Sequence, residues 1–278
     1  MSLAKVRNLR KGHRKMHFRK LPAYIAVGLS LALAACTPTF PKPEHDSTPS
    51  SPDADWEKFL QELNQLESYR YETQATLFFA PDGTRADPPQ ETLISGAAQD
   101  GRILREVKTG ITRRSLLIDG VFYEYQIQAA GETWVFRAEP QAAPDLGHPM
   151  LLRELFQLGA TSSFVGYNEN GVLTFRVDVP QSVTEKWQAG QIENIAQESI
   201  RSNTPISDAM REGFRTFLAP FANDQTITVE LTAEGRLVRT HTTAKIRLGG
   251  EAPTDFISYT TTYSDFNAPG IYVFSPHE

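Results

Sequence analysis

Apolar and polar residues alternate with a period of two along most of this chain. In the stretch YRYETQATLFF, residues 69–79, the odd positions are mostly apolar and the even positions mostly polar. Successive side chains of a strand point to opposite faces of a sheet, so this pattern predicts a strand with one solvated face. The alternation recurs, between turn signals such as Asp119-Gly120, in residues 93–98, 102–108, 113–118, 121–128, 133–138, 172–179, 225–232, 236–248, 255–263 and 271–274. We expect these segments to supply about nine or ten strands of one antiparallel sheet.

Helical spacing of the apolar residues replaces the alternation in three stretches. Acids in the first turn and apolar residues three and four apart predict a helix over residues 55–68. A short apolar helix is predicted over 149–158, and residues 182–219 predict two helices separated by Thr204-Pro205. Strands with one solvated face argue against a doubly wound parallel sheet, whose strands are buried on both faces. We therefore predict an α+β fold in which helices cover the apolar face of a large, curved antiparallel sheet.

The first 35 residues have a different composition. Residues 1–20 hold eight Lys and Arg and no acid, and residues 21–35 are uncharged and mostly apolar. This apolar run is shorter than the roughly 20 residues that a transmembrane helix needs, so it is typical of a signal peptide. It ends in Leu33-Ala34-Ala35-Cys36, which resembles the lipobox of bacterial lipoproteins. The resemblance implies cleavage before Cys36 and a lipid on its thiol; the alternative is a free cysteine in a simple membrane anchor.

Cleavage at this point defines the predicted mature chain. Residues 36–55 hold five prolines among Ser, Thr and acids, a composition typical of an extended tether, which leaves residues 56–278 as the folded domain. Without the eight basic residues of the signal, 20 basic and 33 acidic residues remain, a net charge of −13. This acidity argues against nucleic acid as a partner. We expect an extracytoplasmic protein anchored by acyl chains to the cell membrane, or to the outer membrane if the cell has one.

Few residues of the sequence point to catalysis. His148 precedes the short predicted helix, and His241 lies on the solvated side of its strand. The sequence contains no metal-binding spacing of Cys and His, no G-x-S-x-G motif and no phosphate-binding loop. Carboxylates are scattered over the polar faces, and no pair of them stands out. We therefore predict a protein that is not an enzyme and that holds no metal and no cofactor.

The apolar residues on one face of the predicted sheet are the main functional signal. Their first explanation is a hydrophobic core, which every sheet covered by helices needs. The second is that part of this face lines a cavity for an apolar ligand, because such sites are mainly apolar with a few polar groups. The candidate ligand-binding residues are Tyr71, Leu77, Tyr123, Trp134, Phe175, Val229, Leu231 and Tyr259.

Two stretches near the C-terminus carry a resemblance to a known family. They read ITVELTAEGRLVRTHTTAKI and SYTTTYSDFNAPGIYVFSP, and the second includes Tyr-Ser-Asp-Phe at 263–266, followed by Pro269, Ile271 and Pro276. With the earlier stretch LLRELFQLGATSSFVGYNENGVLTFRVDV, they are similar to the LolA/LppX/LprG-like bacterial lipoprotein superfamily. The resemblance implies an unclosed antiparallel half-barrel wrapped over helices, with a hydrophobic cavity that takes lipid acyl chains. Residues 182–219 depart from the family pattern and would either form a lid or fill the cavity.

Three hypotheses about function follow. The first is a membrane-anchored lipoprotein that binds a lipid or other amphiphile for envelope transport or sensing. The second is an interaction or regulatory lipoprotein with a filled core, which contacts an envelope protein partner at the membrane. The third is a hydrolase, which no motif supports. A closed, dry core would favour the second hypothesis, and a cavity with convergent carboxylates or His241 would favour the third.

Overall fold

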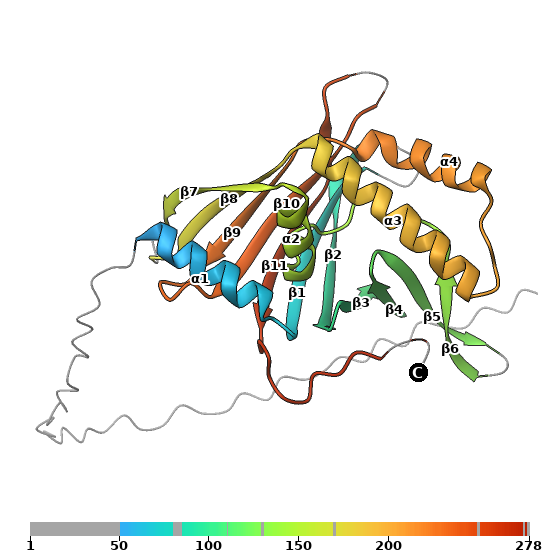
Figure 1. Cartoon of the computed structure of the whole chain (residues 1–278), viewed down its shortest axis with the longest axis horizontal. Helices are drawn as coiled ribbons and strands as arrows, with labels where there is room; N and C mark the ends of the chain where they lie inside the picture. The colour runs from blue at the N-terminus through green and yellow to red at the C-terminus, as the bar shows by residue number, and fades with distance from the viewer. Residues whose placement is uncertain are drawn as a thin grey trace, which may run out of the picture. The chain divides into compact units, whose positions relative to one another are not determined.

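The fold is described from a computed structural model that covers residues 51–79, 85–109, 111–128, 131–168, 171–248, 251–274 and 276. The chain divides into two compact units, residues 1–47 and 48–278, and all described residues belong to the second. Figure 1 shows an open sheet in this unit with helices packed over one of its faces. The predicted signal peptide and Cys36 lie outside the described residues.

The sheet contains eleven strands in the described part of the chain, and every neighbouring pair is antiparallel. The strands are β1 (Ser68–Phe79), β2 (Arg85–Gln99), β3 (Arg102–Thr109), β4 (Ile111–Ile118), β5 (Val121–Gln128), β6 (Gly131–Arg137), β7 (Thr161–Tyr167), β8 (Leu173–Val179), β9 (Gln225–Leu231), β10 (Leu237–Ile246) and β11 (Thr254–Ser264). Their order is β6-β5-β4-β3-β2-β1-β11-β10-β9-β8-β7. Because β6 and β7 are both edges, the sheet is unclosed, which confirms the predicted α+β fold class.

The described residues also form four α-helices and one short 3₁₀ helix; α1 precedes the first strand and the others lie between strands. They are α1 (Pro52–Asn64), α2 (Pro149–Leu158), α3 (Gln181–Arg201), α4 (Asp208–Leu218) and η1 (Ala219–Phe221). Helix α1 begins at Pro52 because the Ser51 hydroxyl accepts a hydrogen bond from the Ala54 amide, at 3.2 Å. Helix α2 ends at Leu158, and the next residue, Gly159, has a φ of 112°, in the left-handed region that favours glycine.

Several elements differ from the sequence prediction, and β2 begins at Arg85 instead of residue 93. Helix α1 ends at Asn64 instead of Ser68, because Ser68 already belongs to β1. Strand β7 was not predicted, since this edge strand is exposed at nearly every position and its sequence shows no alternation. The predicted strand at 271–274 is wrong: Ile271 and Val273 are buried and their neighbours are exposed, yet the segment joins no sheet.

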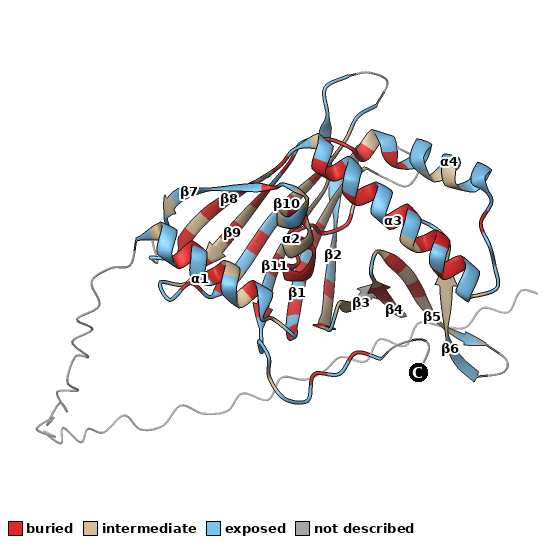
Figure 2. Ribbon diagram, in the orientation of Figure 1, coloured by how far each residue is buried: buried red, intermediate tan, exposed pale blue. Residues whose placement is uncertain are grey.

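The main hydrophobic cluster lies between the helices and one face of the sheet, called here the helix-covered face. Cross-strand pairing places Val229 of β9 beside Phe175 of β8, and both are buried. The Trp56 ring of α1 packs on Phe175 with ring centroids 4.4 Å apart. Figure 2 shows buried positions alternating with intermediate or exposed ones along β8, β9 and β10. The first half of α3 adds Val183 and Trp187 to this cluster, so that part of the predicted insertion fills space over the sheet.

A second, smaller cluster lies on the opposite face of the sheet. Leu104 pairs with Leu116, which pairs with Tyr123, and strand alternation turns all three away from Ile103 and Leu117 of the main cluster. Its other buried members are Val121, Ile195, Ala196, Ile206 and Val273. Helix α3 therefore contributes its first half to one cluster and its second half to the other.

Candidate functional site

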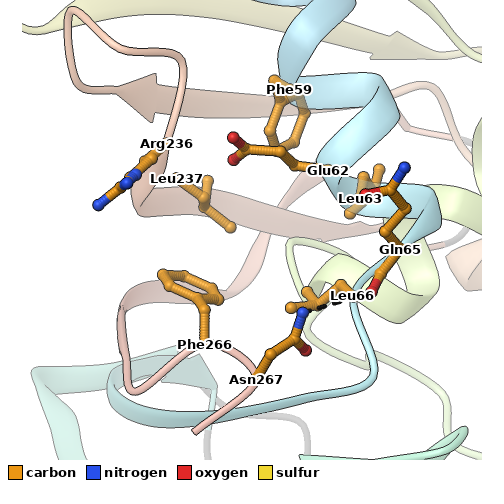
Figure 3. Close-up of a pocket in the computed structure, with 9 residues that line it drawn as sticks. All are labelled: Phe59, Glu62, Leu63, Gln65, Leu66, Arg236, Leu237, Phe266 and Asn267. Carbon is orange, nitrogen blue, oxygen red and sulfur yellow. Dashed lines mark hydrogen bonds between the residues drawn. The ribbon is translucent and has the colours of Figure 1, made fainter.

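An open groove of about 420 Å³ lies beside the C-terminal end of α1 (Figure 3). Its walls come from α1 and the residues after it, from the start of β10 and from the loop that follows β11. The lining residues are Phe59, Glu62, Leu63, Gln65, Leu66, Arg236, Leu237, Phe266 and Asn267. We call this the α1 groove.

The floor and walls of the α1 groove combine apolar and polar side chains in similar measure. Phe59 and Leu63 lie four residues apart on α1, which places both side chains on the face of the helix that meets the sheet. Leu66 lies just beyond the end of the helix and is half-buried, and Phe266 is 36% exposed. In Figure 3, the side chains of Leu66, Leu237 and Phe266 point toward one another across the groove.

Hydrogen bonds fix the loop after β11 against the residues that follow α1. The Asn267 side-chain Oδ1 accepts from the backbone amides of Glu67, at 2.9 Å, and Ser68, at 3.1 Å. The backbone amide of Asn267 in turn donates to the Ser68 carbonyl, at 2.8 Å. Asp265 and Asn267 both have a positive φ, which Asn and Asp tolerate better than most residues. This wall of the groove, including Phe266, is therefore preorganised.

The rim of the α1 groove carries charge of both signs. Glu62 and Arg236 are its charged lining residues, and the Arg236 side chain extends away from the apolar side chains in Figure 3. Hydrogen bonds from Thr232 and the local backbone lower the pKa of Glu234, and Arg236 and Lys58 lower it further. Lys58 of α1 also donates to the Glu234 carbonyl, which joins the helix to the β9–β10 turn. An amphiphile in the groove would find apolar walls and a cation at the rim.

A second candidate functional site lies between the helix-covered face and the loop that precedes α2. The Tyr259 hydroxyl donates to the Ala143 carbonyl at 2.6 Å, and the Tyr263 hydroxyl donates to the Gly147 carbonyl at 2.9 Å. Gly147 lies so close to the sheet that an added Cβ would stand 2.5 Å from the Thr240 Oγ1. Only glycine therefore allows the loop to approach the sheet this closely. Residues 143–148 are called here the buried loop.

The buried loop places a histidine beside a carboxylate. His148 Nε2 lies 3.8 Å from Asp145 Oδ2, which also accepts from the Thr261 hydroxyl at 2.6 Å, while His148 Nδ1 lies 3.2 Å from the Tyr69 hydroxyl. Burial lowers the pKa of His148 to about 4; Asp145 opposes this shift and Arg105 adds to it. The imidazole is therefore neutral at pH 7.

The chemistry of this His–Asp pair is limited by its enclosure. His148 and Asp145 are 5% and 8% exposed, and the cavity beside them measures about 20 Å³. Such a volume holds about one water molecule. The arrangement has no room for a substrate, so it gives the hydrolase hypothesis no support. His241 lies on the opposite face, as predicted, with its Nδ1 3.1 Å from the Thr260 hydroxyl.

The structure distributes the eight predicted ligand-binding residues over several places. Phe175, Val229 and Leu231 are 2%, 0% and 0% exposed within the main cluster. Tyr259 borders the 20 Å³ cavity, and Tyr71 reaches past Gly96, which has no side chain, to donate to the Leu104 carbonyl at 2.8 Å.

The other three predicted residues are scattered. Tyr123 belongs to the cluster on the opposite face, Trp134 packs at its edge, and Leu77 is half-buried near the end of β1. None of the eight lines the α1 groove. Their role in ligand binding stays a prediction.

Sequence reasoning did not single out the residues of the α1 groove. The helical spacing over residues 55–68 predicts Phe59 and Leu63 only as apolar helix positions, and the family resemblance includes Phe266 only as part of the motif at 263–266. The one sequence signal for this groove is Leu66. It continues the apolar spacing of the first helix but lies two residues beyond the end of α1, where it lines the groove. In the described residues, no helix has the length and apolar character of a membrane span. The same residues hold no group of three His, Cys, Asp or Glu side chains placed to bind a metal ion.

Together, the fold and the site define an open antiparallel-sheet protein with a groove of apolar and polar side chains beside a covering helix. Solved structures similar to this chain include the lipoprotein LppX from Mycobacterium tuberculosis, with TM-score 0.37 and 11% identity over 79% of this chain and 98% of that chain. LprF from Mycobacterium bovis has TM-score 0.35 and 14% identity over 81% and 98%. A LolA superfamily protein from Nitrosomonas europaea has TM-score 0.29 and 9% identity over 76% and 91%.

These matches cover most of the chain and agree with the resemblance predicted from the sequence. At these identities the likeness concerns the fold and not the ligand. No protein-family model matches the chain, and no curated protein matches its sequence.

Proposed function

We propose that this protein is a lipid-anchored, extracytoplasmic lipoprotein that binds a lipid or other amphiphile in the α1 groove. The observation that carries this proposal is the juxtaposition of Leu66, Leu237 and Phe266 around an open space of about 420 Å³. Open apolar space between a helix and a sheet is where ligand sites commonly lie. Binding would place the apolar part of the ligand among these side chains and its polar part at the rim.

The affinity would come mainly from burial of the apolar part of the ligand. Each buried CH₂ group contributes about 0.8 kcal/mol, so a segment of a few methylenes against Phe59, Leu63 and Phe266 supports binding without covalent chemistry. Arg236 and Glu62 at the rim together favour a zwitterionic headgroup. Transport and sensing both use such reversible binding, and the groove is compatible with either role.

The proposed membrane attachment rests on the sequence around Cys36. The tether was predicted over residues 36–55, but α1 already begins at Pro52, so only the residues before Pro52 can act as a tether. An extended, proline-rich chain spans about 3.1 Å per residue, so the residues from Cys36 to Ser51 would allow the domain to stand up to roughly 50 Å from the membrane. Cys36→Ala should leave the chain unlipidated and move it out of the membrane fraction. Retention of a lipid-labelled product in that variant would contradict the anchor.

The second candidate function is an interaction lipoprotein that contacts an envelope partner. Its support is the tight filling of the helix-covered face, where Phe175, Val229 and Leu231 have almost no exposed surface. If the domain holds no ligand anywhere, the α1 groove is a surface feature without a lipid, and the protein acts only through contacts with its partner.

Native mass spectrometry of the full chain, purified in mild detergent from its own envelope and extracted with organic solvent, separates the two candidates. We expect a discrete added mass in the native spectrum and a lipid in the extract beyond the covalent anchor. Phe266→Ser should reduce the bound fraction severalfold, because it replaces an apolar groove wall with a hydroxyl. Phe164→Ser is the matched control, since Phe164 is 37% exposed and lies outside the α1 groove. A clean unliganded mass, with no uptake from offered phospholipids, would favour the interaction protein.

A further inference from the structure

A second groove, of about 690 Å³, lies on the sheet face opposite to the main cluster. Its floor comes from β1, β2, β3 and β11, and one wall is the C-terminal segment from Gly270 to Phe274. We call it the tail groove. It differs from the α1 groove in position and lining, because the two share no residue.

The floor of the tail groove is a regular array of polar groups. In β1, the exposed Arg70 and Glu72 alternate with the buried Tyr69, Tyr71 and Thr73, so they point to the opposite face. Strand register then aligns a row across four strands, Thr262–Glu72–Ser95–Glu106. Neighbouring strands lie about 4.8 Å apart, so this row presents hydroxyl and carboxylate groups at regular short spacing.

A second row lies beside the first, two residues along each strand. It runs Ser264–Arg70–Ala97–Leu104, so it begins polar and becomes apolar toward β3. The Arg70 guanidinium is 3.4 Å from the Asp265 carboxylate, and both side chains are more than half exposed. The two rows together form a floor that is polar on the side of β1 and β11.

The wall of the tail groove is held in place by side chains of the β2–β3 hairpin. The Arg102 Nη1 donates to the Val273 carbonyl at 3.0 Å, and the Val273 amide donates to the Gln99 Oε1 at 2.9 Å. Val273 is fully buried in the cluster on the opposite face. Because side chains alternate in direction along this extended segment, the neighbours of Val273 point outward: Tyr272 is 56% exposed and Phe274 is 60% exposed. Their rings lie 4.6 Å apart at 85°, so they form a fixed aromatic pair.

We propose that the tail groove binds carbohydrate, namely a short stretch of neutral sugars. A sugar ring has an apolar face of C–H groups and a rim of hydroxyls, and the groove offers a partner for each. One ring of the aromatic pair supplies a flat apolar face on which the C–H face can pack, and the other ring stands at 85° to it. Glu72 and Glu106 accept hydrogen bonds from sugar hydroxyls, and hydrogen bonds to a charged acceptor are the stronger kind.

Other ligand classes fit the tail groove less well. An acyl chain would remove water from the Glu72 carboxylate and the hydroxyls of the floor without replacing its hydrogen bonds, which costs free energy. An anionic ligand would meet Glu72 and Glu106, while the cations nearby are engaged: Arg70 with Asp265, and Arg114 with Glu106 at 2.8 Å. A cationic peptide is the strongest competitor, because aromatic rings and carboxylates also attract cations.

The test is a binding titration of the full chain, purified in detergent, with four soluble probes. Three are neutral tetrasaccharides, made of N-acetylglucosamine, glucose or mannose, and the fourth is the peptide tetralysine. We expect at least one tetrasaccharide to bind with a dissociation constant in the millimolar range or tighter. Tyr272→Ala and Glu72→Gln should each weaken this binding about tenfold, since they remove the stacking surface and a charged acceptor respectively.

Two control variants show where binding occurs. Tyr167→Ala removes an aromatic ring of similar exposure, 58%, on the distant edge strand β7 and should leave sugar binding unchanged. Phe266→Ser should also leave it unchanged, although it is expected to reduce amphiphile binding in the α1 groove, so the two proposals fail separately. The carbohydrate proposal is overturned if no tetrasaccharide binds, if Tyr272→Ala and Glu72→Gln leave sugar binding unchanged, or if tetralysine binds in place of the sugars.

Discussion

Two adjoining parts of the helix-covered face are buried equally well but in different chemical ways. Over β8 and β9, buried Leu, Phe, Val and Ile side chains pack against α1 and α3. Over β10, β11 and β1, the same face carries Thr73, Thr240, Thr242, Thr261 and Tyr263, all less than 10% exposed. The first part is covered by apolar helix side chains and the second by the backbone and polar groups of the buried loop.

The difference shows that the covering element decides which side chains a sheet face needs. A helix presents an apolar stripe with its backbone hydrogen bonds satisfied internally, so hydrocarbon side chains complete the contact. A loop brings backbone carbonyls that need donors, and the hydroxyls of Tyr259 and Tyr263 supply them. Binding of an apolar ligand fits the margin of the first part, where α1 ends and the α1 groove begins.

The largest expected loss of stability comes from the first part of the helix-covered face, over β8 and β9. Phe175→Ala should lower the free energy of unfolding by about 3–5 kcal/mol, because it removes a fully buried ring that packs on Trp56 and leaves a cavity. Urea unfolding followed by tryptophan fluorescence measures this loss. Phe266→Ala is the matched control: Phe266 is 36% exposed in the α1 groove, so its loss should cost less than about 1 kcal/mol.

These two variants should also separate stability from ligand binding. At a temperature where both proteins are folded, Phe266→Ala should lose more bound amphiphile than Phe175→Ala. The reverse order would mean that the ligand enters the main cluster, as the predicted role of Phe175 requires, and that the α1 groove is not the site.

The sequence allowed the sheet and its apolar face to be predicted because alternation is a local property. Phe175 and Val229 fall on one face by period two alone, and both are buried on that face. The edge strand β7 escaped prediction because an exposed edge needs no alternation. Leu66 was assigned to the first helix because helical spacing does not show where the last turn ends.

The buried loop could not have been predicted from local patterns. Its hydrogen bonds join Gly147 to Tyr263 and Asp145 to Thr261, each pair 116 residues apart in the chain. Nothing in the loop sequence distinguishes it from an exposed proline-containing connection. The tail groove was hidden for the same reason, since its floor is assembled from four strands and its wall from the C-terminal segment.

The second prediction concerns how stability depends on pH, and it tests the second part of the helix-covered face, where the buried loop lies. Burial holds the pKa of His148 at about 4 in the folded protein, below the value of about 6.5 in an unfolded chain. Between these values the unfolded chain takes up a proton and the folded one does not, so stability should fall as pH decreases from about 6.5 to about 4. The full difference corresponds to roughly 3 kcal/mol.

His148→Gln isolates this contribution from that of the acidic groups that titrate over the same range. The variant should be less stable than the parent at pH 7, because the contact with Tyr69 changes, but its stability should depend less steeply on pH between 6.5 and 4. Urea unfolding at a series of pH values gives both slopes. Equal slopes would show that His148 is protonated to the same degree in the folded and unfolded chains.

The smallest expected effect tests single hydrogen bonds of the buried loop. Tyr263→Phe removes a hydroxyl that donates to the Gly147 carbonyl and also bonds the Thr240 hydroxyl, both at 2.9 Å. Because these partners stay buried without a replacement, the loss should be about 1–2 kcal/mol, below that of Phe175→Ala. Amide hydrogen exchange should locate the effect in residues 143–148, with the α1–β8 contact keeping its protection. Faster exchange at Phe175 instead would show that the two parts of the face unfold as one unit, and the distinction between them would then be one of chemistry but not of stability.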